Sequence, residues 1–147
     1  MIRLVDIHSK PHTPTASGRV RNVLDPAEDG TRVRVAIEEV DPGKTCSFVA
    51  CDRTQVAYIL EGQDARVTYT TGGKSSAQTA QRRTGVYLEP GDEATLSASA
   101  TPLRLLVVNV PKHTGKATSG GPATGYFFEE ARLRSLVDEK RIRERTF

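Results

Sequence analysis

The sequence predicts an all-β fold, a barrel or sandwich of short strands followed by one short C-terminal helix. Between residues 32 and 111, apolar segments alternate with turn-forming residues at an interval typical of such folds. In several segments apolar and polar residues alternate one by one, which indicates strands with one buried face. The 147 residues suit a single domain with one core.

Residues 1–31 are predicted to form an N-terminal arm. Turn formers dominate it, as in SKPHTPTASG and DPAEDG, and RVRNVL at 19–24 suits one edge strand. The barrel is expected to begin at residue 32, where Val33, Val35 and Ile37 fall on one face of a half-buried strand. A turn at 41–45 then leads to CSFVAC, the next predicted strand.

Glycine turns join the remaining strands of the predicted barrel. Gly62 separates VAYILE from DARVTYTT, and GGKSS at 72–76 is expected to form a hairpin tip because glycine tolerates a positive φ. A polar return strand at 77–83 precedes GVYLEPGDEATLSAS, which contains a Pro-Gly-Asp turn. The barrel ends with PLRLLVVNVP at 102–111. Both faces of this strand are apolar, which predicts cover on both sides, at the centre of the barrel or by a partner subunit.

The composition changes after residue 111. Residues 112–147 are predicted to form a linker rich in glycine, serine and threonine, then a C-terminal helix and tail. Small and apolar side chains between Phe128 and Val137 recur at an approximately helical spacing. Glu129 and Glu130 supply the acidic residues that stabilise a helix start, so a short helix is expected from about Glu129 to Lys140.

Composition and charge exclude several classes of protein. Apolar residues make up 37% of the chain and charged residues 27%, which is typical of a globular protein. The net charge of +3 is spread along the chain without a basic stripe interleaved with aromatics, so no nucleic-acid partner is expected. No apolar run reaches the length of a signal peptide or a membrane span, so no membrane partner is expected. With two cysteines and no export signal, the expected location is the cytoplasm.

The two cysteines and three histidines do not suggest a disulfide or a zinc site. Cys46 and Cys51 are five positions apart, so on an extended strand their side chains would point to opposite faces. A zinc site would need two further ligands. His8, His12 and His113 all fall in segments predicted as loops.

Three segments, QVAYILEGQDARVTY, GVYLEPGDEATLSAS and PLRLLVVNVP, resemble the cupin superfamily. Its members are small double-stranded β-helix (jelly-roll) barrels, and the resemblance covers about residues 32–111. In that family one motif has two histidines, a glutamate and a glycine; a second has a glycine, a Pro-x-Gly turn and a histidine. Gly62 resembles the first motif's glycine, and Gly85 with Pro90-Gly91 resembles the frame of the second. The resemblance implies a cupin barrel with an N-terminal arm and a short C-terminal helix.

The same resemblance implies that the usual metal ligands are missing. Counting from Gly62 and Gly91, the family's three histidines and one glutamate fall on Val49, Cys51, Ala94 and Gln55; a shift of one residue gives Ala50, Glu93 or Thr95. Valine and alanine have no lone pairs to offer a metal ion, and the glutamine amide lacks the charge of a carboxylate. No metal and no other cofactor are therefore expected.

The residues expected to bind a ligand are Cys51, Gln55, Tyr58 and Tyr87. Gln55 shares a strand face with Ala57 and Ile59, so it should point into the barrel, either to orient a ligand or to hydrogen-bond a neighbouring strand. Cys51 is interpreted either as a reactive thiol or as a small buried side chain. The tyrosines either line a pocket with their phenol groups or pack with the hydroxyl reaching water. The catalytic residues are unknown.

Three functions remain open at this point. The first is a metal-free cupin that binds a small organic molecule in the barrel or has a structural role. The second is a cupin enzyme, such as an oxygenase or isomerase, with atypical ligands or metal-independent acid/base residues. The third is one half of a two-barrel cupin. The substrate is not readable from the fold, which hosts many reactions. A homodimer is expected, because such barrels commonly pair and the last strand suits a partner-covered surface.

Overall fold

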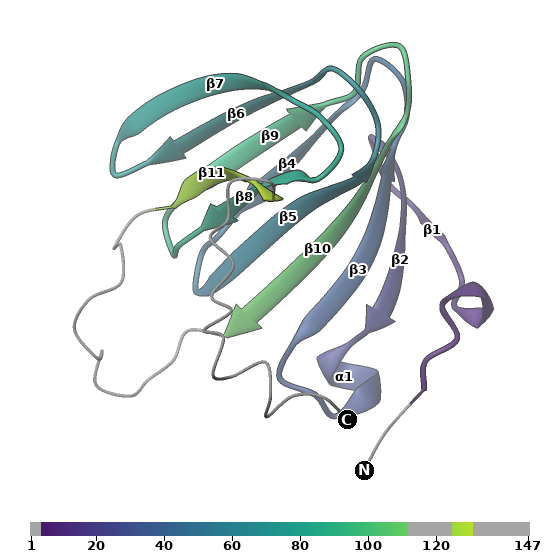
Figure 1. Cartoon of the computed structure of the whole chain (residues 1–147). Coiled ribbons are helices and arrows are strands. Elements are labelled where there is room, and N and C mark those ends of the chain that lie inside the picture. Colours follow the sequence, from purple (N-terminus) through teal and green to yellow (C-terminus); the bar gives the residue numbers. More distant parts are fainter. Residues whose placement is uncertain (1–3, 112–124, 131–147) are drawn as a thin grey trace, which may run out of the picture.

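The structure is a computed structural model that describes residues 4–111 and 125–130. Two antiparallel sheets face each other and form an all-β jelly roll, as predicted (Figure 1). The larger sheet contains, in spatial order, β1 (Thr13–Pro14), β2 (Gly18–Leu24), β3 (Arg34–Val40), β10 (Leu103–Pro111), β5 (Arg53–Glu61), β8 (Thr84–Leu88) and β11 (Tyr126–Glu129). The smaller sheet contains β4 (Thr45–Val49), β9 (Glu93–Ser97), β6 (Ala65–Thr71) and β7 (Lys74–Ala80).

The helical elements within the described residues are short. They are a 3-10 turn, η1 (Ile7–Ser9), and a single α-helical turn, α1 (Pro26–Asp29). The side chain of Asp25 caps α1 by accepting a hydrogen bond from the backbone N–H of Ala27, and Gly30 ends it in the left-handed conformation. Neither element approaches the length and apolar character that a membrane-spanning helix requires.

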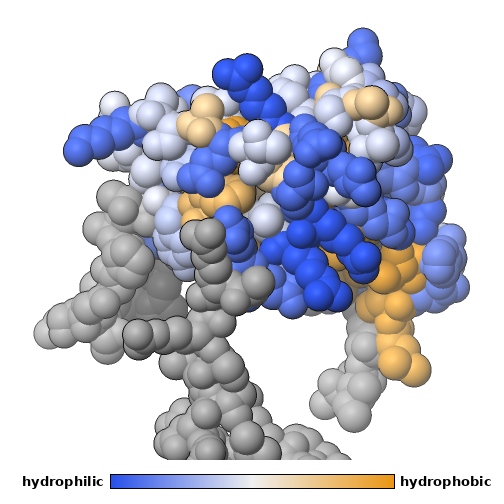
Figure 2. Space-filling view, turned by 45° about the horizontal axis from the view of Figure 1, so that its top comes forward, coloured by the Kyte–Doolittle hydropathy of each residue, from blue (hydrophilic) through white to orange (hydrophobic). Residues whose placement is uncertain are grey.

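A single core fills the space between the sheets. Its largest fully buried side chains come from both sheets: Ile59, Leu88, Leu96, Leu103, Leu105, Val40, Val67 and Val86. Most outward residues of the smaller sheet are polar, with Val49 an exposed exception, and the face of the molecule turned forward in Figure 2 is mainly hydrophilic. The alternation along the smaller sheet is therefore that of an antiparallel sheet with one face packed on the core and the other exposed to solvent.

β3 presents the opposite face to the core from the one predicted. Ala36 pairs with Val107 of β10, and both side chains are buried on the inner face. Val33, Val35 and Ile37 were assigned to one face of a half-buried strand. Val35 and Ile37 do share a face, but it is the outer face of the larger sheet, where Ile37 is 8% exposed and Val35 is partly exposed. That outer face is also apolar where β10 crosses it, so alternation along β3 alone does not identify the inner side.

Two of the predicted glycine turns are confirmed. Gly62 has φ of 131°, and a Cβ there would lie 2.4 Å from the Leu103 side chain, so the turn and the close approach of β10 both require glycine. Gly72 and Gly73 have positive φ at the tip of the β6–β7 hairpin. The polar return strand is β7, at one edge of the smaller sheet.

The segment after the predicted linker begins with a strand. Tyr126–Glu129 pairs antiparallel with β8, so Glu129, near the expected start of the helix, is the last residue of a strand, and Glu130 after it has a 3-10 conformation. The pairing satisfies the free edge of β8, and aromatic residues suit a strand. The residues 112–124 of the predicted linker and 131–140 of the predicted helix lie outside the described residues.

A buried carboxylate fixes the start of β11. Asp92 is 5% exposed, and its Oδ2 accepts hydrogen bonds from the backbone N–H groups of Glu89 at 2.9 Å and Gly125 at 2.8 Å. A Cβ on Gly125 would lie 2.4 Å from the carbonyl oxygen of Tyr87, so glycine is required there. The predicted Pro-Gly-Asp turn thus also anchors the C-terminal strand.

We expect Asp92→Ala to lower the free energy of unfolding by about 2 kcal/mol, because two buried N–H groups lose a charged acceptor. Urea unfolding followed by circular dichroism measures this change. Glu93→Ala, on the exposed side of β9, is the matched control and should change the value by less than about 0.5 kcal/mol. Equal effects of the two substitutions would contradict the anchoring role of Asp92.

Candidate functional site

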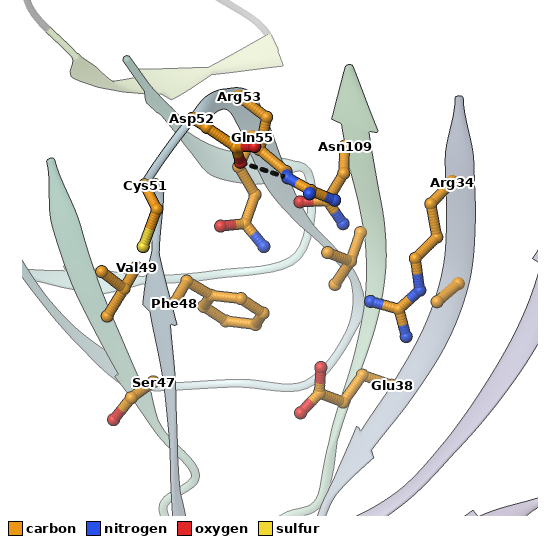
Figure 3. A pocket seen from close by; sticks show the side chains of 12 residues that line it. Arg34, Glu38, Ser47, Phe48, Val49, Cys51, Asp52, Arg53, Gln55 and Asn109 are labelled. Atoms are coloured by element: carbon orange, nitrogen blue, oxygen red, sulfur yellow. Dashed lines mark hydrogen bonds and ion pairs between the residues drawn. The ribbon is translucent and has the colours of Figure 1, made fainter. Parts of the chain in front are cut away.

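A pocket of about 430 Å³ lies between the inner face of the larger sheet and β4, the edge strand of the smaller sheet (Figure 3). We call it the β3–β4 pocket. It exists because the larger sheet continues past β4, so the inner face of β3 is not fully covered (Figure 1). Its lining residues are Arg34, Ala36, Glu38, Ser47, Phe48, Val49, Cys51, Asp52, Arg53, Gln55, Val107 and Asn109.

Three polar side chains form a row across the wall of this pocket. Asn109 of β10 pairs with Arg34 of β3 on one side and with Gln55 of β5 on the other. Gln55 is 8% exposed and Asn109 is 5% exposed, yet neither side-chain amide has a hydrogen-bond partner within the described residues. Buried amides are normally paired, so this wall offers donors and acceptors to whatever occupies the pocket.

The guanidinium of Arg34 is held in place from β2. Its Nε and Nη2 donate hydrogen bonds to the side-chain oxygen of Asn22 at 3.2 Å and 2.8 Å. No carboxylate among the described residues forms an ion pair with it. Arg34 therefore presents a fixed positive charge to the pocket.

Glu38 contributes a negative charge from the same face of β3. Its neighbours across the sheet are Leu105 and Val20, both apolar. Burial raises the pKa of Glu38, and the positive charge of Arg34 offsets this in part. The ionised carboxylate is thus partly desolvated, and no hydrogen bond from a described residue replaces the lost hydration.

The rim of the pocket holds an exposed ion pair and a thiol. Arg53 donates a hydrogen bond from Nε to Asp52 at 3.0 Å, and this bond and charge lower the pKa of Asp52. Cys51 is exposed, so the interpretation of Cys51 as a small buried side chain is wrong. Cys46 is buried, and desolvation raises its pKa to about 12, which leaves it unreactive near neutral pH.

Three of the four positions aligned with the cupin metal ligands, Val49, Cys51 and Gln55, line the β3–β4 pocket, and Ala94 does not. Val49 is 55% exposed and Cys51 is exposed at the rim, whereas Gln55 and Ala94 are buried on the inner faces. From β4 and the residue after it, Phe48 and Ala50 point inward instead, so this segment is shifted by one residue from the count based on Gly62. Figure 3 shows the Phe48 ring directed into the space between the sheets.

No metal-binding arrangement occurs in the parts of the chain that the structure describes. Within residues 4–111 and 125–130, no three or more histidine, cysteine, aspartate or glutamate side chains gather in a way that could hold a metal ion. The pocket has two acidic side chains, Glu38 and Asp52, and the second is engaged by Arg53. The chemistry available there is hydrogen bonding and charge.

The structure separates Tyr58 and Tyr87 from Cys51 and Gln55. Both tyrosines lie on the outer face of the larger sheet, because Gln55 and Ala57 point inward and the residues that alternate with them point outward. Their hydroxyl groups donate hydrogen bonds to the carboxylates of Glu130 and Glu89, which raises the pKa of each phenol. Their rings stack on Phe128 and Tyr126 of β11. Cys51 and Gln55 do share the β3–β4 pocket.

Several pocket residues were not identified as candidates from the sequence, among them the polar residues Arg34, Glu38 and Asn109. The first two were placed on the polar side of their strand and so on the solvent side. Asn109 is the polar exception in the otherwise apolar run LLVVNV, which was a usable signal. Asn109 alternates with Leu105 and Val107 on the inner face of β10, where all three side chains are buried.

Comparison with known proteins identifies the fold. No protein-family model and no curated protein matches the chain. Among solved structures, a point mutant of Bacillus subtilis oxalate decarboxylase superposes with a TM-score of 0.64 at 16% identity, over 76% of this chain and 30% of that one. The chain has the cupin fold. A deletion mutant of the same enzyme matches at 15% identity over 88% of this chain and 32% of its own, again with a TM-score of 0.64.

A third structure of oxalate decarboxylase, from work on its substrate binding mode and reaction specificity, gives a TM-score of 0.64 at 16% identity. It covers 84% of the present chain and 32% of the decarboxylase chain. The present chain thus spans about a third of the length of these enzymes. At this identity the likeness establishes the jelly-roll barrel alone.

We expect Glu38→Gln to stabilise the protein at neutral pH. A raised pKa means that the folded state binds the proton more tightly than the unfolded chain, so stability falls as pH rises from 4.5 through the higher folded-state value. Glutamine has no charge to desolvate. Urea unfolding of both proteins should show a gain for the variant at about pH 7.5 and a smaller gain at about pH 4, where the carboxyl is mostly protonated. A gain that is equal at both pH values, or a loss at the higher one, would contradict this account.

Proposed function

We propose that this cupin binds a small organic molecule in the β3–β4 pocket. The observation that carries the proposal is the pair of buried amides, Gln55 and Asn109, that face the pocket without protein partners. Their amide atoms reach the accessible space of the pocket, so they are available to hydrogen-bond a ligand or ordered water there. The pocket volume of about 430 Å³ is within the usual range of small-molecule sites.

The position of the site supports binding with little rearrangement. The amides and Arg34 project from β5, β10 and β3, three adjacent strands of one sheet. Side chains on paired strands are held more precisely than side chains on loops. Asn22 from β2 restrains the Arg34 guanidinium further.

A second candidate function is acid/base catalysis in the same pocket. It is favoured by Glu38, whose pKa is raised by burial while it faces a cavity, since such groups are frequent at active sites. The oxalate decarboxylase likeness adds no substrate to this candidate, because its low identity supports the fold alone. Binding is the more economical proposal, since it needs no reacting group beyond those that line the pocket.

The binding proposal is tested by thermal-shift screening of small acids, amines, amino acids, sugars and aromatic compounds against the protein and against the double variant Gln55→Leu, Asn109→Leu. A ligand at about a hundred times its Kd should stabilise the native state by about 2.7 kcal/mol. We expect compounds that shift the wild-type melting temperature to lose this effect in the double variant and to keep it in Gln78→Leu, on exposed β7. Equal shifts in all three proteins, or no shift by any compound, would contradict a binding role for this pocket.

We also propose that the outer face of the larger sheet forms a homodimer interface. Apolar side chains lie side by side there in two rows across β3, β10 and β5: Ile37, Leu106 and Tyr58 in one, Val35, Val108 and Val56 in the other. Five of these six side chains are partly exposed in the single chain. Beyond them a row of charges, with ion pairs Arg19–Glu39 and Arg104–Glu61, borders the apolar area. An apolar centre with a polar rim is the usual composition of a protein interface.

Sedimentation velocity tests the dimer. The wild-type protein is expected to sediment as a dimer, and Val108→Arg as a monomer, because the substitution places a charge at the centre of the apolar rows. Val49→Arg introduces the same residue at an exposed position of β4 and should leave the dimer intact. A monomeric wild type, or a dimeric Val108→Arg variant, would refute this interface.

A further inference from the structure

We propose that the ligand of the β3–β4 pocket carries an ammonium group and a carboxylate on the same carbon atom, as a free α-amino acid does, with Arg34 binding the carboxylate and Glu38 the ammonium group. The inference rests on the proposed binding function and adds the chemical class of the ligand. It is argued from the two charges that β3 presents to the pocket and from the amides beside them.

The two charges stand at the same pocket but are not paired with each other. Arg34, Ala36 and Glu38 alternate onto one face of β3, and all three line the pocket. The small side chain of Ala36 lies between the charged residues and leaves space there. No ion pair joins Arg34 to Glu38, and Figure 3 shows both side chains directed into the space between β3 and β4. A small molecule can therefore bridge them.

The Arg34 end is suited to a carboxylate. The hydrogen bonds to Asn22 use Nε and Nη2, so Nη1 is left without a partner among the described residues. Asn109 is directly opposite on β10 and supplies the unpaired N–H groups of a buried amide. A guanidinium and an amide on adjacent strands form a two-donor site, the arrangement that planar carboxylates prefer.

The Glu38 end is suited to an ammonium group. Its cross-strand neighbours Val20 and Leu105 offer no hydrogen bond, and burial raises its pKa. A bound cation would supply the missing counter-charge and favour the ionised carboxylate. An ammonium ion would therefore stabilise the ionised Glu38 carboxylate, whereas a carboxylate would be repelled by it and a neutral sugar would supply no opposite charge.

The charge balance of the pocket favours a ligand with both signs. The remaining ionic groups, Asp52 and Arg53, neutralise each other at the rim through a contact of 3.0 Å. A simple anion would meet Arg34 but be repelled by Glu38, and a simple amine would meet Glu38 but be repelled by Arg34. A zwitterion satisfies both, so the two charges also discriminate against molecules that carry only one.

The rest of the pocket limits the size and polarity of the ligand. Gln55, next to Asn109 in the polar row, is free to hydrogen-bond a third group. Phe48 and Val107 provide an apolar wall. With a volume of about 430 Å³, near the lower end of the range for ligand sites, the pocket suits a single amino acid or a compound of similar size.

Isothermal titration calorimetry with the standard L-amino acids tests the inference. For the amino acid that binds most tightly, two matched probes are titrated: the carboxylic acid that lacks its amino group and the amine that lacks its carboxyl group. We expect each probe to bind at least about tenfold more weakly than the amino acid, since each loses one charged contact.

Variants assign the two ends. Arg34→Gln should weaken binding of the amino acid at least about tenfold but leave the affinity for the amine unchanged. Glu38→Gln should weaken binding of the amino acid by a similar factor but leave the affinity for the carboxylic acid unchanged. Arg34→Lys keeps the charge and should retain part of the affinity. Arg66→Gln and Glu93→Gln, at exposed positions of β6 and β9, are the matched controls and should bind as the wild type does. Circular dichroism and urea unfolding confirm that each variant is folded.

The outcomes separate this inference from the proposed function. If the acid or the amine binds as tightly as the amino acid, or if the two variants leave its affinity unchanged, the zwitterion assignment is wrong. If no amino acid binds but another compound does, with loss of binding in Gln55→Leu, Asn109→Leu, the inference fails while the pocket remains a binding site. If no compound of any class binds, both fail.

Discussion

The pairing of β10 with both β3 and β5 determines the rest of the structure. β10 pairs with β3 from Leu103 to Asn109 and with β5 from Arg104 to Pro111, so it aligns three strands in one register. Along its inner face, Leu105 and Val107 complete the core. Two residues further, the same register brings Asn109 between Arg34 and Gln55. The packing of the barrel and the polar wall of its pocket therefore follow from one set of backbone hydrogen bonds, and a shift of one residue would exchange the two faces.

Much of this fold could be predicted from the sequence, because antiparallel strands and glycine turns leave local patterns. The alternation of β5 identified Gln55 as inward, and Gly62 was identified as a turn; both are confirmed. The inward residues near β4 could not be found by counting. A bend at 51–52 and a bulge in β5, where Arg104 faces Glu61 and Leu105 faces Ile59, break the regular spacing between β4 and Gly62. Phe48 and Ala50 therefore occupy the inner positions that Val49 and Cys51 were expected to hold.

The missed parts of the site depend on contacts between distant segments. Arg34 and Glu38 look solvent-facing in their own strand and become pocket residues only because the smaller sheet ends at β4. The strand β11 was not predicted, and a helix was expected from about Glu129, which is the last residue of this strand. The strand forms because β8 has a free edge and Asp92 accepts the Gly125 N–H, and neither partner is close in sequence. Tertiary partners of this kind override local preference.

The packing around Phe48 has a consequence for how the barrel could change over evolution. Phe48, Ala50 and Ala94 are 5%, 0% and 2% exposed, and Phe48 is paired with Ala94 across β4 and β9. A single substitution to histidine at Ala94 would therefore have to displace buried neighbours, at a cost in stability, before the imidazole could serve as a ligand. One such ligand would not bind a metal ion, because Val49 offers no lone pair and Gln55 has no charge. More than one substitution would thus be needed to place a set of metal ligands at these positions.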